Sequence, residues 1–425
     1  MSDANVKPTA SRRFFGVGTN ETETQEFLEH LEEYGYAIAA SVANPDEIEA
    51  AKSEMWDFLE GYRGVDGRKD TGVRRDNVDT WHDYDENGGR RWMGSTSTGI
   101  IAGAGVGQAQ FMWRIRSLPG VANAFGAVWD VKGEDLLVSF DGANAFRPWQ
   151  YDKDWKTDGG WYHLDQNAYN PGKEGKCCVQ GVVLLTDATE ETGGLVVVPG
   201  SQKHFSAICE RNAYKPNSEA ERQQGGLSDF VHLAKDDEVL ESCGGGRLVC
   251  AKAGDLVIWD SRTVHCNSPA LVEFNTRTTE KGSSPSSSPS PDSCDWDLIR
   301  MVAYVCMTPS SWATTDVLEK RWDAYVHNLT TNHWPHEFVG GTMRPNLPAN
   351  DPLLLSAEQK KMVGGRMSEP PGSALDSFQE PLTEKQREAR DILDLAEETE
   401  AKGNHLGAIK LYKQAYKLDP TLEFP

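Results

Sequence analysis

After about residue 130, the sequence changes from helical spacing to a series of short apolar segments separated by turn residues. This series limits the possible folds more than any other feature, because segments of this length suit strands better than helices. Helices followed by many short strands predict an α+β fold, with helices packed on one face of an antiparallel β-sandwich. The predicted strands are 136–141, 161–166, 177–186, 195–198, 247–251, 255–259 and 299–308.

The other elements follow from helical spacing and from helix start signals. Asn44-Pro45 opens a predicted helix, since proline suits the first helical turn. The stretch 64–91 is charged and contains glycine, which predicts a loop or lid. The predicted helices cover 24–34, 44–62, 109–129 (interrupted at Leu118-Pro119-Gly120) and 312–329, and a further strand covers 36–42.

Composition divides the chain into a main domain and appended segments. The run Ser283 to Pro291 is low-complexity and lacks apolar residues to bury, which predicts a disordered insertion. Long loops add closure entropy slowly, so a folded domain tolerates such an insertion. The predicted parts are a disordered tail (1–20), a main domain (21–340) with its insertion (273–297), a linker (341–382) and a helical hairpin (383–425).

The C-terminal hairpin has the spacing of a single tetratricopeptide-like repeat, with small and aromatic residues at Ala396, Ala408, Tyr412 and Ala415. A generic amphipathic helix pair is the alternative interpretation. One repeat cannot bury its own apolar face, so the hairpin is predicted to dock on a protein partner or on its own main domain.

The formal net charge of −22 excludes nucleic acid and anionic membranes as main partners, because both require a basic surface. Apolar runs have the length of strands, so no membrane span is expected, and the start of the chain lacks a signal-peptide pattern. The eight cysteines form no Cys-x-x-Cys pair, which favours reduced thiols. These features predict a cytoplasmic protein.

The segment His163-Leu-Asp165 is the strongest candidate for a chemical site. Residues i and i+2 of a strand point to the same face, so both side chains can bind one metal ion. His265 on a facing strand would complete a triad of two histidines and one carboxylate. This triad leaves coordination positions open, as in non-haem Fe(II) oxygenases. A His/Asp pair hydrogen-bonded in a polar core is the alternative.

Four segments of the chain resemble the phytanoyl-CoA dioxygenase family of Fe(II)/2-oxoglutarate oxygenases. They are Tyr34-Gly-Tyr-Ala-Ile-Ala with the helix that follows it, Trp161 to Gln166, Glu191 to Ser201, and Ala253 to His265. The resemblance implies a double-stranded β-helix (jelly-roll) core with flanking helices. It also implies a dioxygenase that uses Fe(II), 2-oxoglutarate and O2, with ascorbate as a candidate reductant. Such an enzyme hydroxylates a small molecule, lipid-like or natural-product-like, and releases succinate and CO2.

The resemblance further implies an arginine that binds the distal carboxylate of 2-oxoglutarate, at the start of the last core strand. Arg300 fits this position because an apolar strand follows it directly, and Arg277 inside the insertion is the alternative. An arginine binds a carboxylate through two parallel hydrogen bonds, which lysine cannot do. Ser268 or Asn267 could add a hydrogen bond to the same carboxylate.

The substrate is less well specified, because specificity in such folds depends on loops, here 64–92 and 142–160. Polar residues near the metal-binding segments are candidate substrate contacts, or else surface and supporting groups: Arg147, Lys153, Gln166 and Arg262. Halogenation is disfavoured because Asp165 occupies the position that a halide would need. Two other functions stay open. One is a cupin-type protein with Zn2+ or Mn2+, and the other is a partner-binding protein with a vestigial oxygenase core.

Overall fold

The computed structural model describes residues 6–9, 11–64, 67–213, 215–216, 218, 227–272, 296–337 and 353–364, and isolated residues between 389 and 417. For residues 62–64 and 67–69 it describes the backbone alone. The chain forms two compact units. The first unit comprises residues 1–338 and 344–365, and the second comprises residues 339–343 and 366–425.

The helices of the first unit begin where the sequence supplies caps. The Asn44 side chain and the Glu47 side chain form a reciprocal capping box at the start of α2, with Pro45 in its first turn. Pro119 begins α4 and so separates it from α3, which confirms the predicted interruption. The α-helices are α1 (Glu21–Tyr34), α2 (Pro45–Glu60), α3 (Gln110–Arg116), α4 (Pro119–Trp129), α5 (Phe205–Asn212), α7 (Glu238–Ser242), α8 (Thr315–Val326) and α9 (Ala357–Val363).

Short 3-10 helices connect several of these elements. They are η1 (Val78–Thr80), η2 (Val106–Gln108), η3 (Gly133–Asp135), η4 (Lys153–Trp155), η5 (Ser201–His204) and η6 (Ser310–Trp312).

The first sheet has six strands in the order β1-β13-β11-β15-β9-β12. Its neighbours pair antiparallel, except that β1 lies parallel to β13. The strands are β1 (Lys7–Thr9), β9 (His163–Leu164), β11 (Gly194–Val197), β12 (Val231–His232), β13 (Arg247–Val249) and β15 (His265–Ser268).

The second sheet has eight strands, with the order β2-β3-β14-β10-β16-β8-β6 and with β7 paired to β16. These strands are β2 (Arg13–Phe15), β3 (Tyr36–Ala40), β6 (Ile100–Ile101), β7 (Leu136–Val138), β8 (Ala143–Phe146), β10 (Val179–Leu184), β14 (Leu256–Asp260) and β16 (Arg300–Pro309). A separate antiparallel pair joins β4 (Gly61–Gly64) and β5 (Gly67–Asp70).

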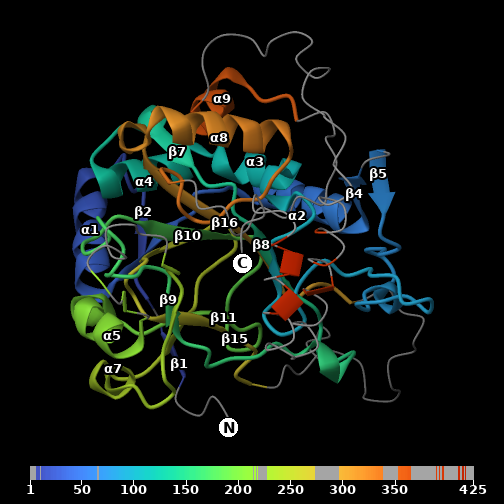
Figure 1. The fold of residues 1–425 in the computed structure, drawn as a ribbon, viewed down its shortest axis with the longest axis horizontal. Helices are drawn as coiled ribbons and strands as arrows, with labels where there is room; N and C mark the ends of the chain where they lie inside the picture. Colours follow the sequence, from blue (N-terminus) through green and yellow to red (C-terminus); the bar gives the residue numbers. More distant parts are fainter. Residues whose placement is uncertain are drawn as a thin grey trace, which may run out of the picture. The chain divides into compact units, whose positions relative to one another are not determined.

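The eight-stranded sheet lies between two apolar layers, and its side chains alternate between them. Val179 and Val183 of β10 belong to the large core that also holds the apolar residues of α3 and α4. Val182 and Leu184 belong instead to a smaller core shared with Leu195 of the six-stranded sheet. Figure 1 shows α3, α4 and α8 on one side of β10 and β16, and β9, β11 and β15 on the other. We call the faces of the two sheets that enclose the smaller core the inner faces.

The predicted α+β organisation, with helices covering one face of a pair of sheets, agrees with this mixed fold. Several predicted elements differ in extent. The strand predicted over 161–166 is confined to His163–Leu164, and β8 and β15 were not predicted as strands. Within the described part of the chain, no helix is long and apolar enough to cross a membrane.

The expectation of a disordered tail over 1–20 is wrong for the two segments that form β1 and β2. β2 lies parallel to β3, Phe14 is buried, and the Arg13 guanidinium binds the buried Asp255 carboxylate at 2.7 Å. A strand of three residues is too short to show alternation in a sequence. The partner of β1, strand β13, also lies far along the chain, so local spacing could not reveal that pairing.

The expectation of a linker over 341–382 is wrong for α9, which belongs to the first unit. Ser356 and Gln359 form a capping box at its start. Arg321 of α8 holds its end, because the buried guanidinium donates hydrogen bonds to the carbonyl oxygens of Met362 and Val363 at 3.0 Å. The same group donates to the carbonyls of Pro335 and Val138. Burial lowers the pKa of Arg321 to about 9, and the nearby Arg116 adds to this effect.

We expect Arg321→Met to lower the free energy of unfolding by more than about 3 kcal/mol, because it leaves several buried carbonyl oxygens without a donor. Arg114→Met is the matched control, since Arg114 pairs with Glu54 and has 37% of its side chain exposed. The control should cost about 1 kcal/mol or less. Urea unfolding of both variants checks the difference, and equal losses would contradict this role of Arg321.

The remaining expectations fall largely outside the described residues. The insertion is described only at Trp296 and Asp297. In the second unit, the described residues between 389 and 417 are helical, and Ala396 and Ala415 are buried. Ala408 and Tyr412 lie outside the described residues, so the tetratricopeptide-like repeat stays a prediction.

Candidate active site

Two adjacent strands of the six-stranded sheet bring His163, Asp165 and His265 together. β9 and β15 pair antiparallel with His163 opposite His265, and the centroids of the two imidazole rings are 4.2 Å apart. Asp165 follows directly after β9 on the same side of the chain as His163. One candidate ligand atom from each residue lies within 4.8 Å of the others. Three donors converging in this way form a group that can hold one metal ion.

Backbone hydrogen bonds fix how the two imidazole rings face. Nδ1 of His163 lies 3.2 Å from the carbonyl oxygen of Trp161, and Nδ1 of His265 lies 3.0 Å from that of Thr263. A ring that donates from Nδ1 presents the lone pair of Nε2. Both Nε2 atoms face the Asp165 carboxylate, at 3.6 Å for His163 and 3.2 Å for His265. With Nδ1 turned to the backbone, Nε2 of each ring is the atom that a metal ion held beside the carboxylate would bind.

Aromatic rings enclose the His163 imidazole. Trp161 stacks on one side, with ring centroids 4.9 Å apart and planes 8° from parallel. Phe230 stacks at 4.7 Å and is half exposed. His163 itself is 4% exposed. The ring can therefore neither rotate freely nor be fully hydrated.

Burial and charge set the protonation of the site. Burial lowers the pKa of His163, and the nearby His265 lowers it further. For Asp165, burial acts to raise the pKa, but interactions with His163 and His265 outweigh it and hold the pKa well below its usual value. A neutral imidazole and an ionised carboxylate are the forms that bind metal ions. The donor set therefore fits a divalent cation.

Arg300 lies on the inner face of the eight-stranded sheet, at the start of β16. It is 2% exposed, and its Nη1 donates a 2.7 Å hydrogen bond to Oδ1 of Asn144. Its Nε is buried and has no hydrogen-bond partner among the described residues. Burial lowers the pKa of Arg300, while the neighbouring Tyr304 hydroxyl opposes that shift. A buried guanidinium with an unused donor can bind an anion.

Polar side chains gather around Arg300 because strand alternation directs them inward. Tyr304 is four residues further along β16 and so shares the inner face with Arg300. Burial raises the pKa of the Tyr304 phenol, and Arg300, Asn267 and Asn144 oppose this shift. Asn267 lies two residues after His265 on β15 and faces the same way, whereas the hydroxyl of Ser268 donates to the carbonyl oxygen of Pro269. The structure therefore brings Asn267 to the hydroxyl of Tyr304, beside Arg300, and leaves Ser268 bonded locally.

Two glycines let β11 approach this group of residues closely. Gly193 has φ of +71°, and a Cβ there would lie 2.3 Å from the carbonyl oxygen of Ser268. A Cβ on Gly194 would make ordinary contacts, one of them 3.8 Å from Nε of Arg300. β11 thus passes beside that nitrogen without a side chain at Gly194.

The predicted substrate residues all have partners within the described part of the chain. Arg147 donates to the carbonyl of Trp81 and binds Asp83, and the exposed Lys153 lies over the ring of Trp149. The amide of Gln166 donates to the carbonyl oxygens of Lys173 and Gly175. The Arg262 guanidinium binds the Asp260 carboxylate. None of these contacts joins the triad. Arg277 lies outside the described residues.

Three residues of the site were not singled out in the sequence: Asn144, Gln180 and Tyr304. The amide of Gln180 donates a 2.9 Å hydrogen bond to Oδ2 of Asp165. The sequence does contain an indication of each, because each is a polar residue within a short apolar strand. Each also lies at a position that faces inward. Reading that signal requires the strand register, which fixes the inward face.

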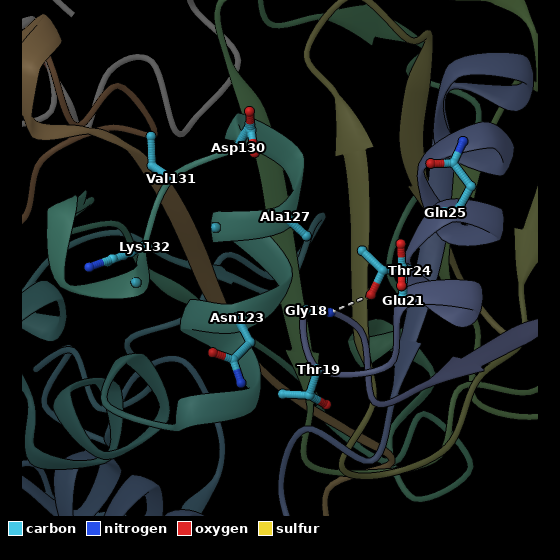
Figure 2. Close-up of a pocket in the computed structure, with 12 residues that line it drawn as sticks. Gly18, Thr19, Glu21, Thr24, Gln25, Asn123, Ala127, Asp130, Val131 and Lys132 are labelled. Carbon is cyan, nitrogen blue, oxygen red and sulfur yellow. Dashed lines mark hydrogen bonds between the residues drawn. The ribbon is translucent and has the colours of Figure 1, made fainter.

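A separate cavity of about 710 Å³ lies between α1 and α4. Figure 2 shows Thr24 and Glu21 of α1 opposite Asn123 and Ala127 of α4, with a hydrogen bond from the Gly18 amide to the Thr24 hydroxyl. No residue of the triad lines this cavity. It is therefore distinct from the candidate active site.

Two named proteins are similar in sequence to part of this chain. "Ava biosynthesis cluster protein O" of Aspergillus versicolor is 30% identical over 237 residues, which are 55% of this chain and 66% of that protein. Ectoine dioxygenase of Bordetella bronchiseptica is 32% identical over 152 residues, 35% of this chain and 44% of that enzyme. The chain thus spans just under two thirds of the first relative and less than half of the second.

A solved structure, EctD from S. alaskensis with 2-oxoglutarate and 5-hydroxyectoine, has a TM-score of 0.40 and 13% identity to this chain. The superposition covers 82% of this chain and 90% of that one. Residues 142–270 match the model of the phytanoyl-CoA dioxygenase (PhyH) family, and this segment contains His163, Asp165 and His265. Residues 142–270 are thus similar to the phytanoyl-CoA dioxygenase family, a family of Fe(II)/2-oxoglutarate-dependent dioxygenases.

Proposed function

We propose that the chain is an Fe(II)/2-oxoglutarate-dependent dioxygenase whose metal ligands are His163, Asp165 and His265. The observation that carries the proposal is the convergence of one ligand atom from each residue within 4.8 Å. Two imidazoles and one carboxylate suit Fe(II) and leave positions for a cosubstrate and oxygen. The proposal includes a double-stranded β-helix formed by the two sheets, with the triad on its inner face.

Arg300 is proposed to bind the distal carboxylate of 2-oxoglutarate, with Asn267 and Tyr304 as additional donors. Support for this role comes from its Nε, which has no partner among the described residues, and from the lack of a side chain at Gly194 beside it. A buried cation without a carboxylate partner is unfavourable, and an anionic cosubstrate would relieve that cost. Ser268 is the weaker candidate because its hydroxyl already donates to a backbone carbonyl.

When bound, Fe(II) and 2-oxoglutarate would supply the oxidation of a C–H bond with O2, yielding succinate and CO2. The chain's own residues hold the ligands, orient the cosubstrate and keep water out. Trp161 and Phe230 cover the His163 ring for this purpose. Ascorbate is proposed as a reductant that keeps the iron in its ferrous form.

The substrate is proposed to be a small molecule of natural-product type. Support comes from the names of two relatives, a biosynthesis cluster protein and an ectoine dioxygenase. A lipid-like molecule is the other candidate class. Four residues remain candidates for a supporting role at the substrate site: Arg147, Lys153, Gln166 and Arg262. Each already has a partner in the chain.

Succinate formation tests the proposal. The purified chain, loaded with Fe(II) and given 2-oxoglutarate, ascorbate and O2, is expected to form succinate, and a metabolite panel that includes ectoine should raise the rate for the true substrate class. Activity with Zn2+ or Mn2+ but not Fe(II) would favour the cupin-type alternative. A folded, iron-loaded chain that forms no succinate would favour the vestigial core.

The C-terminal hairpin is proposed to bind a protein partner in the cytoplasm and to take no part in the chemistry. Ending the chain after Gln379 should therefore leave the rate of succinate formation within about twofold of the full chain, because separate compact units can act independently. Light scattering should show an altered oligomeric state or partner binding. A truncated chain that folds normally but loses all activity would overturn this view.

A further inference from the structure

Gln180 is the polar residue among the inward-facing residues of β10. It lies on β10, where Val182 and Leu184 share its inner face and belong to the smaller core. β10 pairs with β14 on one side and with β16 on the other, opposite Trp259 and Cys306 at this position. The backbone of Gln180 is thus fixed by the centre of the eight-stranded sheet.

The side chain of Gln180 reaches from that sheet to the other. Its Nε2 donates a 2.9 Å hydrogen bond to Oδ2 of Asp165, which lies next to β9 in the six-stranded sheet. Gln180 is 6% exposed. A buried amide is unfavourable unless it is hydrogen-bonded, and an apolar residue would fill this position without that cost. The position of the amide is therefore explained by what it binds.

The hydrogen bond makes the two carboxylate oxygens of Asp165 inequivalent. Oδ2 accepts from Gln180 and lies 3.2 Å from Nε2 of His265, whereas Oδ1 faces Nε2 of His163 at 3.6 Å and is not bonded to Gln180. The backbone of Asp165 is held separately: its N–H lies 3.3 Å from the Ser261 carbonyl oxygen, and its carbonyl oxygen lies 3.2 Å from Nε2 of His333. With the backbone fixed, rotation of the carboxylate is the remaining freedom, and Gln180 restrains it.

We propose that Gln180 is a positioning residue that holds the Asp165 carboxylate with one oxygen engaged and the other directed to the metal. This inference rests on the proposed metal centre. A carboxylate that binds through one oxygen leaves a coordination position free, whereas one that turns to bind through both oxygens fills it. Partners that orient metal ligands in this way change metal affinity by about 10- to 100-fold when removed.

Gln180→Met tests the proposal, because methionine keeps the length of the side chain and removes the donor. Gln180→Asn is a second variant that keeps the amide but is one methylene too short to reach Oδ2. Co2+ is titrated anaerobically into the metal-free full chain, and affinity and the visible absorption of bound Co2+ are measured. Both variants should bind Co2+ about 10- to 100-fold more weakly than the wild type, with an altered absorption band.

Gln202→Met is the matched control. Gln202 is also buried, at 7% exposure, and its Nε2 donates to the carbonyl oxygens of Glu32 and Glu33 and not to a residue of the triad. This variant should melt at a lower temperature yet bind Co2+ as the wild type does. An equal loss of affinity in the control would assign the effect to general destabilisation and overturn the proposal.

Two further outcomes separate this inference from the proposed function. Wild-type Co2+ affinity and absorption in folded Gln180→Met or Gln180→Asn would overturn the positioning role and leave the metal centre intact. Absence of Co2+ binding by the wild-type chain would overturn the metal centre, and the role of Gln180 with it.

Discussion

Asp165→Ala is expected to reduce Fe(II)-dependent turnover of 2-oxoglutarate to less than about 1% of the wild type, since even the loss of a residue that only orients a ligand costs about 10- to 100-fold. Asp165 supplies the carboxylate of the triad, and the substitution removes it. It also leaves Nε2 of His163 and Nε2 of His265 without the anion that faces them. Succinate formation and Co2+ titration measure the loss.

Folding must be separated from chemistry in this test. Asp187→Ala is the matched control, because Asp187 binds Lys252 at 2.7 Å and has 42% of its side chain exposed. Circular dichroism should show that both variants keep the fold, and the control should keep its activity. Asp165→Ala with wild-type turnover would remove Asp165 from the metal centre.

Arg300→Ala is expected to weaken the apparent affinity for 2-oxoglutarate by tens- to hundreds-fold. The physical reason is the loss of a charge-assisted contact worth on the order of 2–4 kcal/mol. Arg300→Lys should recover only part of the affinity, because an ammonium group lacks the planar pair of donors. The Michaelis constant for 2-oxoglutarate and its binding to the metal-loaded chain both measure the effect.

Arg277→Ala and Arg114→Ala complete the comparison. Arg114 pairs with Glu54 on α2 and should be neutral for 2-oxoglutarate binding. If Arg300→Ala bound 2-oxoglutarate normally while Arg277→Ala did not, the cosubstrate role would pass to Arg277.

The residues of the triad could be found from the sequence because each lies in a short segment whose own pattern marks it. His163 and Asp165 are two residues apart, and His265 ends a strand-and-turn segment that begins at Ala253. Arg300 was predicted from the resemblance, which places an arginine at the start of the last core strand, and Arg277 remains the alternative. Local spacing indicated the three residues of the triad.

Asn144 and Gln180 could not be found in that way, since their importance depends on pairing between distant strands. Asn144 reaches Arg300 because β8 pairs with β16, 156 residues further along the chain. Gln180 reaches Asp165 because two different sheets face each other. The strands β1 and β2 were missed for a related reason, because a strand of three residues has too few positions to show a period.

The connection between β15 and β16 has a consequence for how this chain can change. His265 and Asn267 take their places from the register of β15 on β9 and β11, and Arg300 takes its place from the register of β16 on β8 and β10. Neither register depends on how many residues join the two strands. Natural variation can therefore lengthen or shorten that connection, at a closure cost that grows slowly with length, without moving a metal ligand relative to the arginine. Strand pairing, rather than sequence distance, sets the separation between His265 and Arg300.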